Sequence, residues 1–195
     1  MLNAGAGGMD YGISTTVVHV DFVYDALRGL RFGITGDLHA LPLSTHSVDA
    51  VVCVGSVLNY VSLAEAISEI SRVCRPGGLL LLEYERSESP IFRGSAAYKM
   101  PVGQIRAEYR QAVHSMWVYS DRYVDTIIDA ANLVILESGW FHGTSAIAAG
   151  HGLRTSIAAR LATFDRLFKF MRQFAANRWL LATTPLNSPF FARRH

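Results

Sequence analysis

Leu2–Asp10, with the sequence LNAGAGGMD, is the segment from which the organisation of this 195-residue chain is best understood. A short apolar run leads into glycines at positions 5, 7 and 8. Glycine lacks a Cβ atom, so it adopts positive φ angles and lets the backbone approach a ligand closely. A strand that ends in such a turn can present backbone N–H groups to a bound molecule. The segment therefore predicts a strand followed by a ligand-facing turn.

Working outward from this turn, short apolar runs alternate with segments of helical spacing. We expect further strands at Thr16–Asp21, Ile34–Asp37, Val48–Val54, Leu79–Glu85, Leu133–Ser138 and Arg178–Thr184. We expect helices at Phe22–Leu27, Leu63–Cys74, Ser120–Ala131 and residues 153–176. Alternation of this kind predicts an α/β fold with a parallel sheet and right-handed crossovers.

Composition limits the classes of protein to consider. Half of the residues are hydrophobic and 17% are charged, which is enough to build a sizeable core. The net charge of +2 gives no electrostatic reason to expect a nucleic-acid partner. Cys53 and Cys74 lie in apolar or helical surroundings, typical of reduced thiols. No apolar run has the about 20 residues of a membrane span, and no signal peptide or metal-ligand cluster is recognisable. These features predict a cytoplasmic protein.

The organisation expected is one domain over residues 1–185 and a loose, basic tail over residues 186–195. Ser87–Tyr119 is less regular, because it contains two prolines and two glycines among aromatic and charged residues. We interpret it as a long connection with some helix, and both a functional lid and a solvated insertion agree with its composition.

In a parallel sheet, ligands bind beyond the carboxyl ends of the strands, so the residues that follow each strand matter most. Asp21 ends the second strand, where a carboxylate can accept hydrogen bonds from both hydroxyls of a ribose. Asp37 ends the third strand, where a carboxylate and neighbouring backbone can meet an adenine amino group, and Leu38 can pack on the ring. Together with the glycine turn, these residues predict an adenosine site.

Two nucleotide-binding motifs do not fit. A nicotinamide-dinucleotide fingerprint has the pattern Gly-x-Gly-x-x-Gly. Gly5 and Gly7 match it, but Asp10 occupies the third position, where a carboxylate would repel a pyrophosphate. The P-loop pattern fails because no Gly-Lys-Ser/Thr follows the turn.

The ordered motifs resemble those of the class I S-adenosylmethionine-dependent methyltransferases, of the small-molecule group called type 11. Asn3–Gly7 resembles the first motif, Val18–Asp21 the ribose-binding strand, and Gly36–Pro42 the adenine-contacting segment. Val48–Tyr60 resembles the fourth strand and the turn that faces the methyl donor. Arg72–Gly78 resembles the Arg-x-Leu-x-Pro-Gly-Gly end of a helix.

The resemblance implies a Rossmann-like three-layer αβα sandwich, with a mostly parallel sheet that closes on an antiparallel strand. It implies S-adenosyl-L-methionine as cofactor and a small-molecule methyl acceptor. The cofactor-binding residues expected from it are Asn3, Gly5, Gly7, Asp21, Phe22, Asp37, Leu38 and Gly55.

The chain departs from the family pattern at four points. Asn3 replaces the acid of the first motif, Met9 stands where a third glycine is usual, and the interval from Gly7 to Asp21 is short. The family also has a helical segment before the first strand, whereas this sequence begins at Met1. We therefore expect a methyltransferase without that cover, and either an active enzyme or a silent relative agrees with the pattern.

Methyl transfer by direct displacement depends mainly on alignment, and a general base is needed only for oxygen or carbon acceptors. Glu83, Glu85, His142 and His151 are candidate bases, and Asn59 and Tyr60 could orient an acceptor. Histidines serve often as caps or surface residues, and Glu83 and Glu85 point to opposite faces of a strand. No catalytic residue is therefore assigned. Two alternative classes stay open, a silent binding domain that acts through a partner and a nicotinamide-dependent oxidoreductase.

Overall fold

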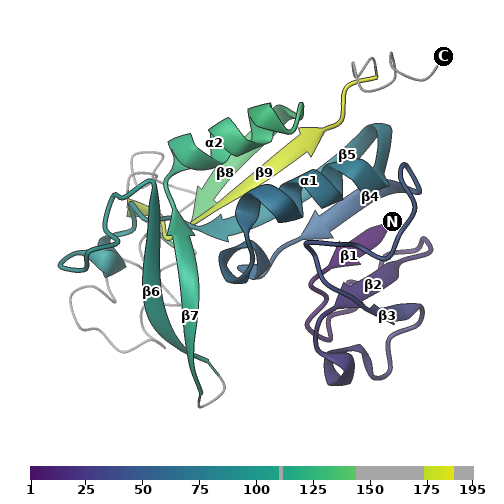
Figure 1. The fold of residues 1–195 in the computed structure, drawn as a ribbon, viewed down its shortest axis with the longest axis horizontal. Coiled ribbons are helices and arrows are strands. Elements are labelled where there is room, and N and C mark those ends of the chain that lie inside the picture. The colour runs from purple at the N-terminus through teal and green to yellow at the C-terminus, as the bar shows by residue number, and fades with distance from the viewer. Residues whose placement is uncertain (110–111, 144–173, 187–195) are drawn as a thin grey trace. The chain divides into compact units, whose positions relative to one another are not determined.

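The computed structural model describes residues 1–109, 112–143 and 174–186 (Figure 1). The chain divides into two compact units. Unit 1 comprises residues 1–82, 126–137 and 180–195, and unit 2 comprises residues 83–125 and 138–179. Three strands pass from one unit into the other along the chain. The expectation of a single domain over residues 1–185 stays a prediction.

A seven-stranded sheet organises unit 1, in the order β3-β2-β1-β4-β5-β9-β8. The strands are β1 (Leu2–Ala4), β2 (Val18–Asp21), β3 (Gly33–Thr35), β4 (Val48–Cys53), β5 (Cys74–Glu85), β8 (Val134–Phe141) and β9 (Asn177–Thr183). The pairs β1–β2, β1–β4, β2–β3 and β4–β5 are all parallel. The carboxyl ends of the first four strands therefore meet at one edge of the sheet, and the predicted α/β fold with a mostly parallel sheet is confirmed.

The last strand runs the other way. The Gly77 N–H donates to the Thr184 carbonyl, and the Thr184 N–H donates to the Gly78 carbonyl, which is an antiparallel arrangement. The arrow of β9 in Figure 1 accordingly points opposite to that of β5. The antiparallel closing strand expected from the resemblance is thus present.

Helix α1 (Leu63–Val73) forms because its apolar residues recur at helical spacing. Its buried side chains are Leu63, Ala66, Ile67, Ile70 and Val73, as the sequence predicts. Helix α2 (Asp121–Ala130) begins after Ser120, whose hydroxyl accepts the Tyr123 N–H at 3.2 Å and caps the helix. No helix in the described part of the chain is long and apolar enough to cross a membrane.

Three short 3-10 helices complete the helical elements described: η1 (Tyr24–Leu27), η2 (Val57–Tyr60) and η3 (Pro90–Phe92). The helix expected over Phe22–Leu27 is therefore reduced to a single 3-10 turn. Most of the helix expected over residues 153–176 lies outside the described residues.

The connection after β5 differs from its prediction. In unit 2, β6 (Val102–Tyr109) and β7 (Ala112–Tyr119) pair as an antiparallel hairpin, where the sequence suggested irregular structure with some helix. Inward-facing Met116 and Val118 of β7 pack on Phe92 and Ala97. Gly103 allows this packing, because a Cβ atom there would lie 2.7 Å from Cα of Ala97. The hairpin thus depends on residues that lie outside its own strands.

Strand β5 begins earlier than expected, at Cys74 instead of Leu79. Cys74 pairs with Val48, the register then shifts, and Leu79 pairs with Ala50. Pro76-Gly77-Gly78, which predicts the end of a helix, therefore also forms an irregular first part of the strand. Gly77 has a φ of 76°, which favours glycine.

Candidate functional site

The turn after β1 is tied to the neighbouring strand β2. The Gly5 and Ala6 N–H groups both donate to the Val20 carbonyl, at 2.8 and 3.1 Å. Gly5, Gly7 and Gly8 all have positive φ angles, so the turn depends on glycine as predicted. The chain consequently reverses directly above the carboxyl end of the sheet in unit 1.

Gly5 is constrained by a close neighbour as well as by its backbone angle. A Cβ atom on Gly5 would lie 2.7 Å from Cγ2 of Val57 and closer still to Cγ1. A Cβ atom on Gly7 would meet only the Gly5 carbonyl, at 3.9 Å. Gly5 is therefore needed for packing between the turns after β1 and β4, whereas Gly7 leaves open space in front of the turn.

Asp21 joins three loops at this edge. Its Oδ2 atom accepts the Gly7 N–H at 2.7 Å and its Oδ1 atom accepts the Val23 N–H at 2.8 Å. Its backbone carbonyl accepts the Gly36 N–H at 3.0 Å. One residue at the end of β2 thus holds the turns after β1 and β3 in place, while its side chain stays partly exposed.

The departure at Asn3 has a local explanation. Asn3 is buried in β1, and its Nδ2 atom donates to the Met9 carbonyl at 3.0 Å and lies 3.3 Å from Nδ1 of His19. The Met9 carbonyl can only accept a hydrogen bond, so an amide N–H₂ fits beside it and a carboxylate does not. Asn3 holds the glycine turn from within, and this role could not be derived from the motif.

Asp37 follows β3 and forms a compact turn with His39. Its Oδ1 atom accepts the His39 N–H at 2.9 Å and lies 2.6 Å from His39 Nδ1. The His39 backbone N–H, against the opposing effect of burial, lowers the pKa of the Asp37 carboxyl. Asp37 is therefore an anion at neutral pH, with a side chain that is 49% exposed. Sequence reasoning missed His39, although its position two residues after an aspartate is the signal of a local turn.

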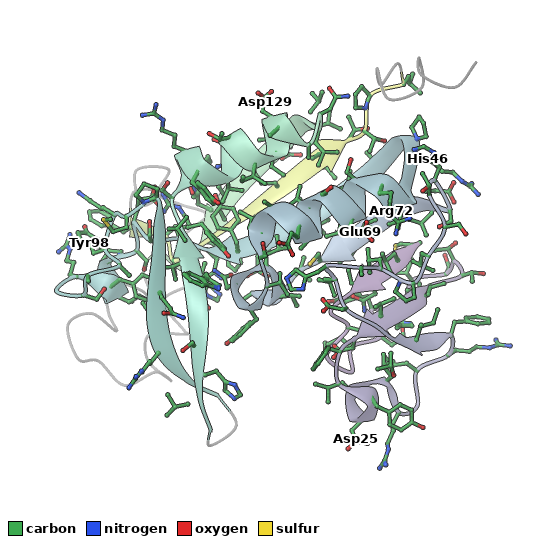
Figure 2. All side chains as sticks on the ribbon, viewed as in Figure 1. Asp25, His46, Glu69, Arg72, Tyr98 and Asp129 are labelled. Atoms are coloured by element: carbon green, nitrogen blue, oxygen red, sulfur yellow. The ribbon has the colours of Figure 1, made fainter. Side chains whose placement is uncertain are left out.

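The chain that follows this turn is held against α1. Arg72 donates to Glu69 Oε1 at 2.6 Å and Oε2 at 2.7 Å, and to the Leu41 and Leu43 carbonyls. Glu69 in turn accepts the Leu41 N–H at 2.8 Å. Figure 2 shows Glu69 and Arg72 side by side on α1. The segment that carries Asp37 is thus fixed at its far end.

The remaining predicted residues differ in exposure. Phe22 is 76% exposed, whereas Leu38 is 4% exposed, so Leu38 lies in the core and only its backbone could serve a ligand. Gly55 has a φ of 80° and follows β4. All eight predicted cofactor-binding residues lie in unit 1, at or next to the ends of β1 to β4.

The candidate bases belong to unit 2 or lie outside the described residues. Glu83 is buried in unit 2 and its Oε1 atom accepts the Asn177 Nδ2–H at 2.8 Å. Glu85 and His142 also belong to unit 2, and His151 lies outside the described residues. Asn59 is buried and Tyr60 is 45% exposed, both in η2. Within residues 1–109, 112–143 and 174–186, no group of His, Cys, Asp and Glu could hold a metal ion.

Unit 2 contains a second polar centre, the Asp121 cluster, formed by Tyr84, Arg86, Asp121, Trp140 and Arg178. Asp121 accepts hydrogen bonds from Tyr84 Oη at 2.8 Å, Arg86 Nε at 2.8 Å, Arg86 Nη2 at 3.0 Å and Trp140 Nε1 at 3.0 Å. The Arg178 guanidinium lies 5.3 Å from the centre of the Trp140 ring and 4.0 Å from Asp121. Burial alone would raise the pKa of Asp121, but the hydrogen bonds and charge of Arg86 hold it below its usual value.

Comparison with known proteins finds a family model that matches part of the chain. Residues 5–82 match the family model described as a methyltransferase domain. A search among curated proteins found no match.

Solved structures share the fold at low sequence identity. A SAM-dependent methyltransferase from Methanosarcina mazei is 13% identical, with a TM-score of 0.62, over 95% of this chain and 92% of that one. Geranyl diphosphate C-methyltransferase from Streptomyces coelicolor A3(2), solved with S-adenosyl-L-homocysteine, is 16% identical, with a TM-score of 0.60, over 94% of this chain and 72% of that one. The cyclase SpnF is 17% identical, with a TM-score of 0.62, over 95% of this chain and 74% of that one.

Proposed function

From the class I S-adenosylmethionine-dependent methyltransferase fold of this chain, and from the family of its residues 5–82, we propose that it transfers a methyl group from S-adenosyl-L-methionine to a small-molecule acceptor. The observation that carries this proposal is the joining of three strand-end loops by Asp21. Such an arrangement supplies the backbone turn, the carboxylate and the second acidic position that an adenosine ligand needs.

The residues present fit the cofactor. Gly7 leaves open space in front of the turn, and Asp21 has lone pairs left for ribose hydroxyls. Asp37 supplies an acceptor for the base amino group, and the exposed Phe22 ring supplies a surface on which the base can stack. Asn3, Gly5, Leu38 and Gly55 complete the proposed set through the shape of the backbone. The bound cofactor supplies an electrophilic methyl group on a sulfonium sulfur.

The first test is thermal unfolding with and without saturating S-adenosylhomocysteine. A ligand at about 100 times its dissociation constant adds about 2.7 kcal/mol to the native state, so the midpoint should rise by several degrees. Absence of a shift in a cooperatively folding protein would refute the proposal. A shift without methyl transfer to any acceptor of a small-molecule panel would favour the silent binding domain, and a shift with nicotinamide dinucleotide alone would favour the oxidoreductase.

A pair of exposed aromatic residues provides a matched test of the site. Phe22→Ala should weaken S-adenosylhomocysteine binding about tenfold, because base stacking on an aromatic ring contributes about 1–3 kcal/mol. Tyr24→Ala is the control, since Tyr24 is 68% exposed in the adjacent η1 and is not in the proposed set. Isothermal calorimetry measures both affinities, and equal effects of the two substitutions would contradict the placement of the base at Phe22.

A further inference from the structure

His39 connects two elements of unit 1, the turn after β3 and the residue that precedes α1. Its Nδ1 atom lies 2.6 Å from Oδ1 of Asp37. Its Nε2 atom accepts the backbone N–H of Ser62 at 2.8 Å. Both ring nitrogens therefore have a defined partner, although the side chain is 31% exposed.

The contact with Ser62 fixes the position of the His39 proton. A backbone N–H can only donate, so Nε2 must offer its lone pair. A neutral imidazole then carries its single proton on Nδ1. The Nδ1–H group consequently donates to Asp37 Oδ1, and the histidine cannot turn its ring without losing one of the two hydrogen bonds.

The orientation of the Asp37 carboxylate follows from these contacts. Oδ1 accepts both the side-chain and the backbone N–H of His39. Among the residues that the structure describes, none donates a hydrogen bond to Oδ2 of Asp37. Because the side chain is 49% exposed, Oδ2 is the oxygen available to a ligand. The Arg72–Glu69 pair anchors the same segment at Leu41, so the backbone that carries Asp37 is also fixed.

We propose that His39 is a positioning residue that aims Oδ2 of Asp37 at the amino group of the adenine base and so makes the site prefer adenine to hypoxanthine. This inference rests on the proposed function, which supplies the adenosine ligand. Adenine presents an N–H₂ donor to a carboxylate, whereas hypoxanthine presents a carbonyl oxygen that a carboxylate repels. Selectivity of this kind depends on holding the carboxylate in one orientation.

Two substitutions separate the contacts of His39. In His39→Asn the side-chain N–H₂ replaces Nδ1, so the hydrogen bond to Asp37 is kept and that to Ser62 is lost. In His39→Gln the longer amide reaches the position of Nε2, so the contact with Ser62 is kept and that with Asp37 is lost. Asp37→Asn serves as the reference for a site that no longer distinguishes adenine from hypoxanthine.

The experiment measures dissociation constants of S-adenosylhomocysteine and its hypoxanthine analogue by calorimetry for the full chain. The wild type should prefer adenine about 10- to 100-fold, as expected for a hydrogen bond to a charged group. His39→Gln should lower this preference at least about fivefold, towards that of Asp37→Asn, whereas His39→Asn should keep it within about twofold.

The outcomes are distinguishable. If the wild type does not bind S-adenosylhomocysteine, the proposed function fails and this inference fails with it. If the wild type binds and discriminates but His39→Gln discriminates equally well, the role of His39 is refuted while the proposed function stands. An equal loss of the adenine preference in His39→Asn and His39→Gln also overturns the inference, because only His39→Gln loses the contact with Asp37. Full discrimination by Asp37→Asn overturns it as well, because the preference would then not depend on the Asp37 carboxylate.

Discussion

Asp21 and Asp121 show two opposite ways to use a carboxylate. Asp21 in unit 1 accepts the backbone N–H groups of Gly7 and Val23, and it stays partly exposed. Asp121 in unit 2 accepts four hydrogen bonds from the side chains of Tyr84, Arg86 and Trp140, and its side chain is 19% exposed. The first arrangement leaves lone pairs for a ligand, whereas the second uses them within the protein. The number of unused lone pairs therefore distinguishes the proposed binding position at Asp21 from the structural position at Asp121.

This comparison predicts that Asp121→Asn has the largest effect on stability. The substitution removes the negative charge that two buried guanidinium groups share, and breaking a buried ion pair from one side costs about 3–5 kcal/mol. Urea unfolding of the two proteins measures the difference. Asp125→Asn is the control, because Asp125 is 46% exposed and forms a surface ion pair with Arg178, so it should cost about 1 kcal/mol or less. Equal effects would contradict the assignment of Asp121 as the centre of the cluster.

The same variant has a defined pH dependence. Because the pKa of Asp121 is lower in the folded than in the unfolded chain, its stabilisation is present above the unfolded value of about 3.9 and is lost as the pH falls towards the folded value. The difference in unfolding free energy between wild type and Asp121→Asn should therefore shrink below about pH 4. A difference that grew on acidification would show that the carboxylate is not stabilised in the folded state.

Among substitutions in unit 1, Gly5→Ala is expected to lower the free energy of unfolding the most. The new Cβ atom would overlap Val57, and Gly5 has a φ of 72°, so strain and overpacking together should cost about 2–4 kcal/mol. Gly12→Ala is the matched control, since its φ of 62° is similar but a Cβ atom meets nothing within 4 Å. It should cost about 1–2 kcal/mol in thermal or urea unfolding. A Gly5→Ala protein no less stable than Gly12→Ala would mean that the two turns are not packed together.

The smallest effect expected is that of Glu88→Gln, next to the Asp121 cluster. Burial, followed by the neighbouring charge of Asp121, raises the pKa of Glu88, and its Oε2 atom is buried without a hydrogen bond. A raised folded pKa means that stability falls as the pH rises through that value.

Glu88→Gln keeps an acceptor for the Asp121 N–H, which Glu88 binds at 3.1 Å, and removes the charge. We expect a gain of about 1 kcal/mol or less at pH 8 and no gain at pH 4, from urea unfolding at both values. Glu88 Oε2 also lies 3.9 Å from Arg86 Nε, so a loss at pH 8 would show that this ion pair outweighs the burial of Glu88 and the nearby charge of Asp121.

Much of the fold was predictable because local signals were strong. The apolar run of β4 and the one-sided apolar stripe of α1 required no knowledge of distant residues. The hairpin of β6 and β7 was missed because its packing partners, Phe92 and Ala97, lie outside its strands. The early start of β5 was missed because Pro76-Gly77-Gly78 also ends a helix, and its pairing with Val48 is not visible in the local sequence.

For the candidate site, the sequence predicted which residues follow the strands but not what they contact. The adjacency of Gly5 and Val57, and that of His39 and Ser62, depends on turns that come together only in the folded sheet. The packing of Leu38 on the base stays a prediction, and we propose Phe22 as the stacking surface because its side chain is exposed whereas that of Leu38 is buried. The exposure of a side chain at a strand end depends on all the loops that meet at that edge of the sheet. It therefore cannot be predicted from one position of the sequence.

The contacts of Thr184 have a consequence for the order of synthesis. Thr184 binds the first part of β5 through its backbone to Gly77 and Gly78 and through its hydroxyl, which donates to the Arg75 carbonyl at 2.5 Å. These partners are separated by more than 100 residues, as the hydroxyl contact spans 109. A ribosome must therefore add more than 100 residues after the first part of β5 before this strand, in the middle of the sheet, can obtain its last hydrogen bonds. The nascent protein must protect that strand edge until those residues have been made.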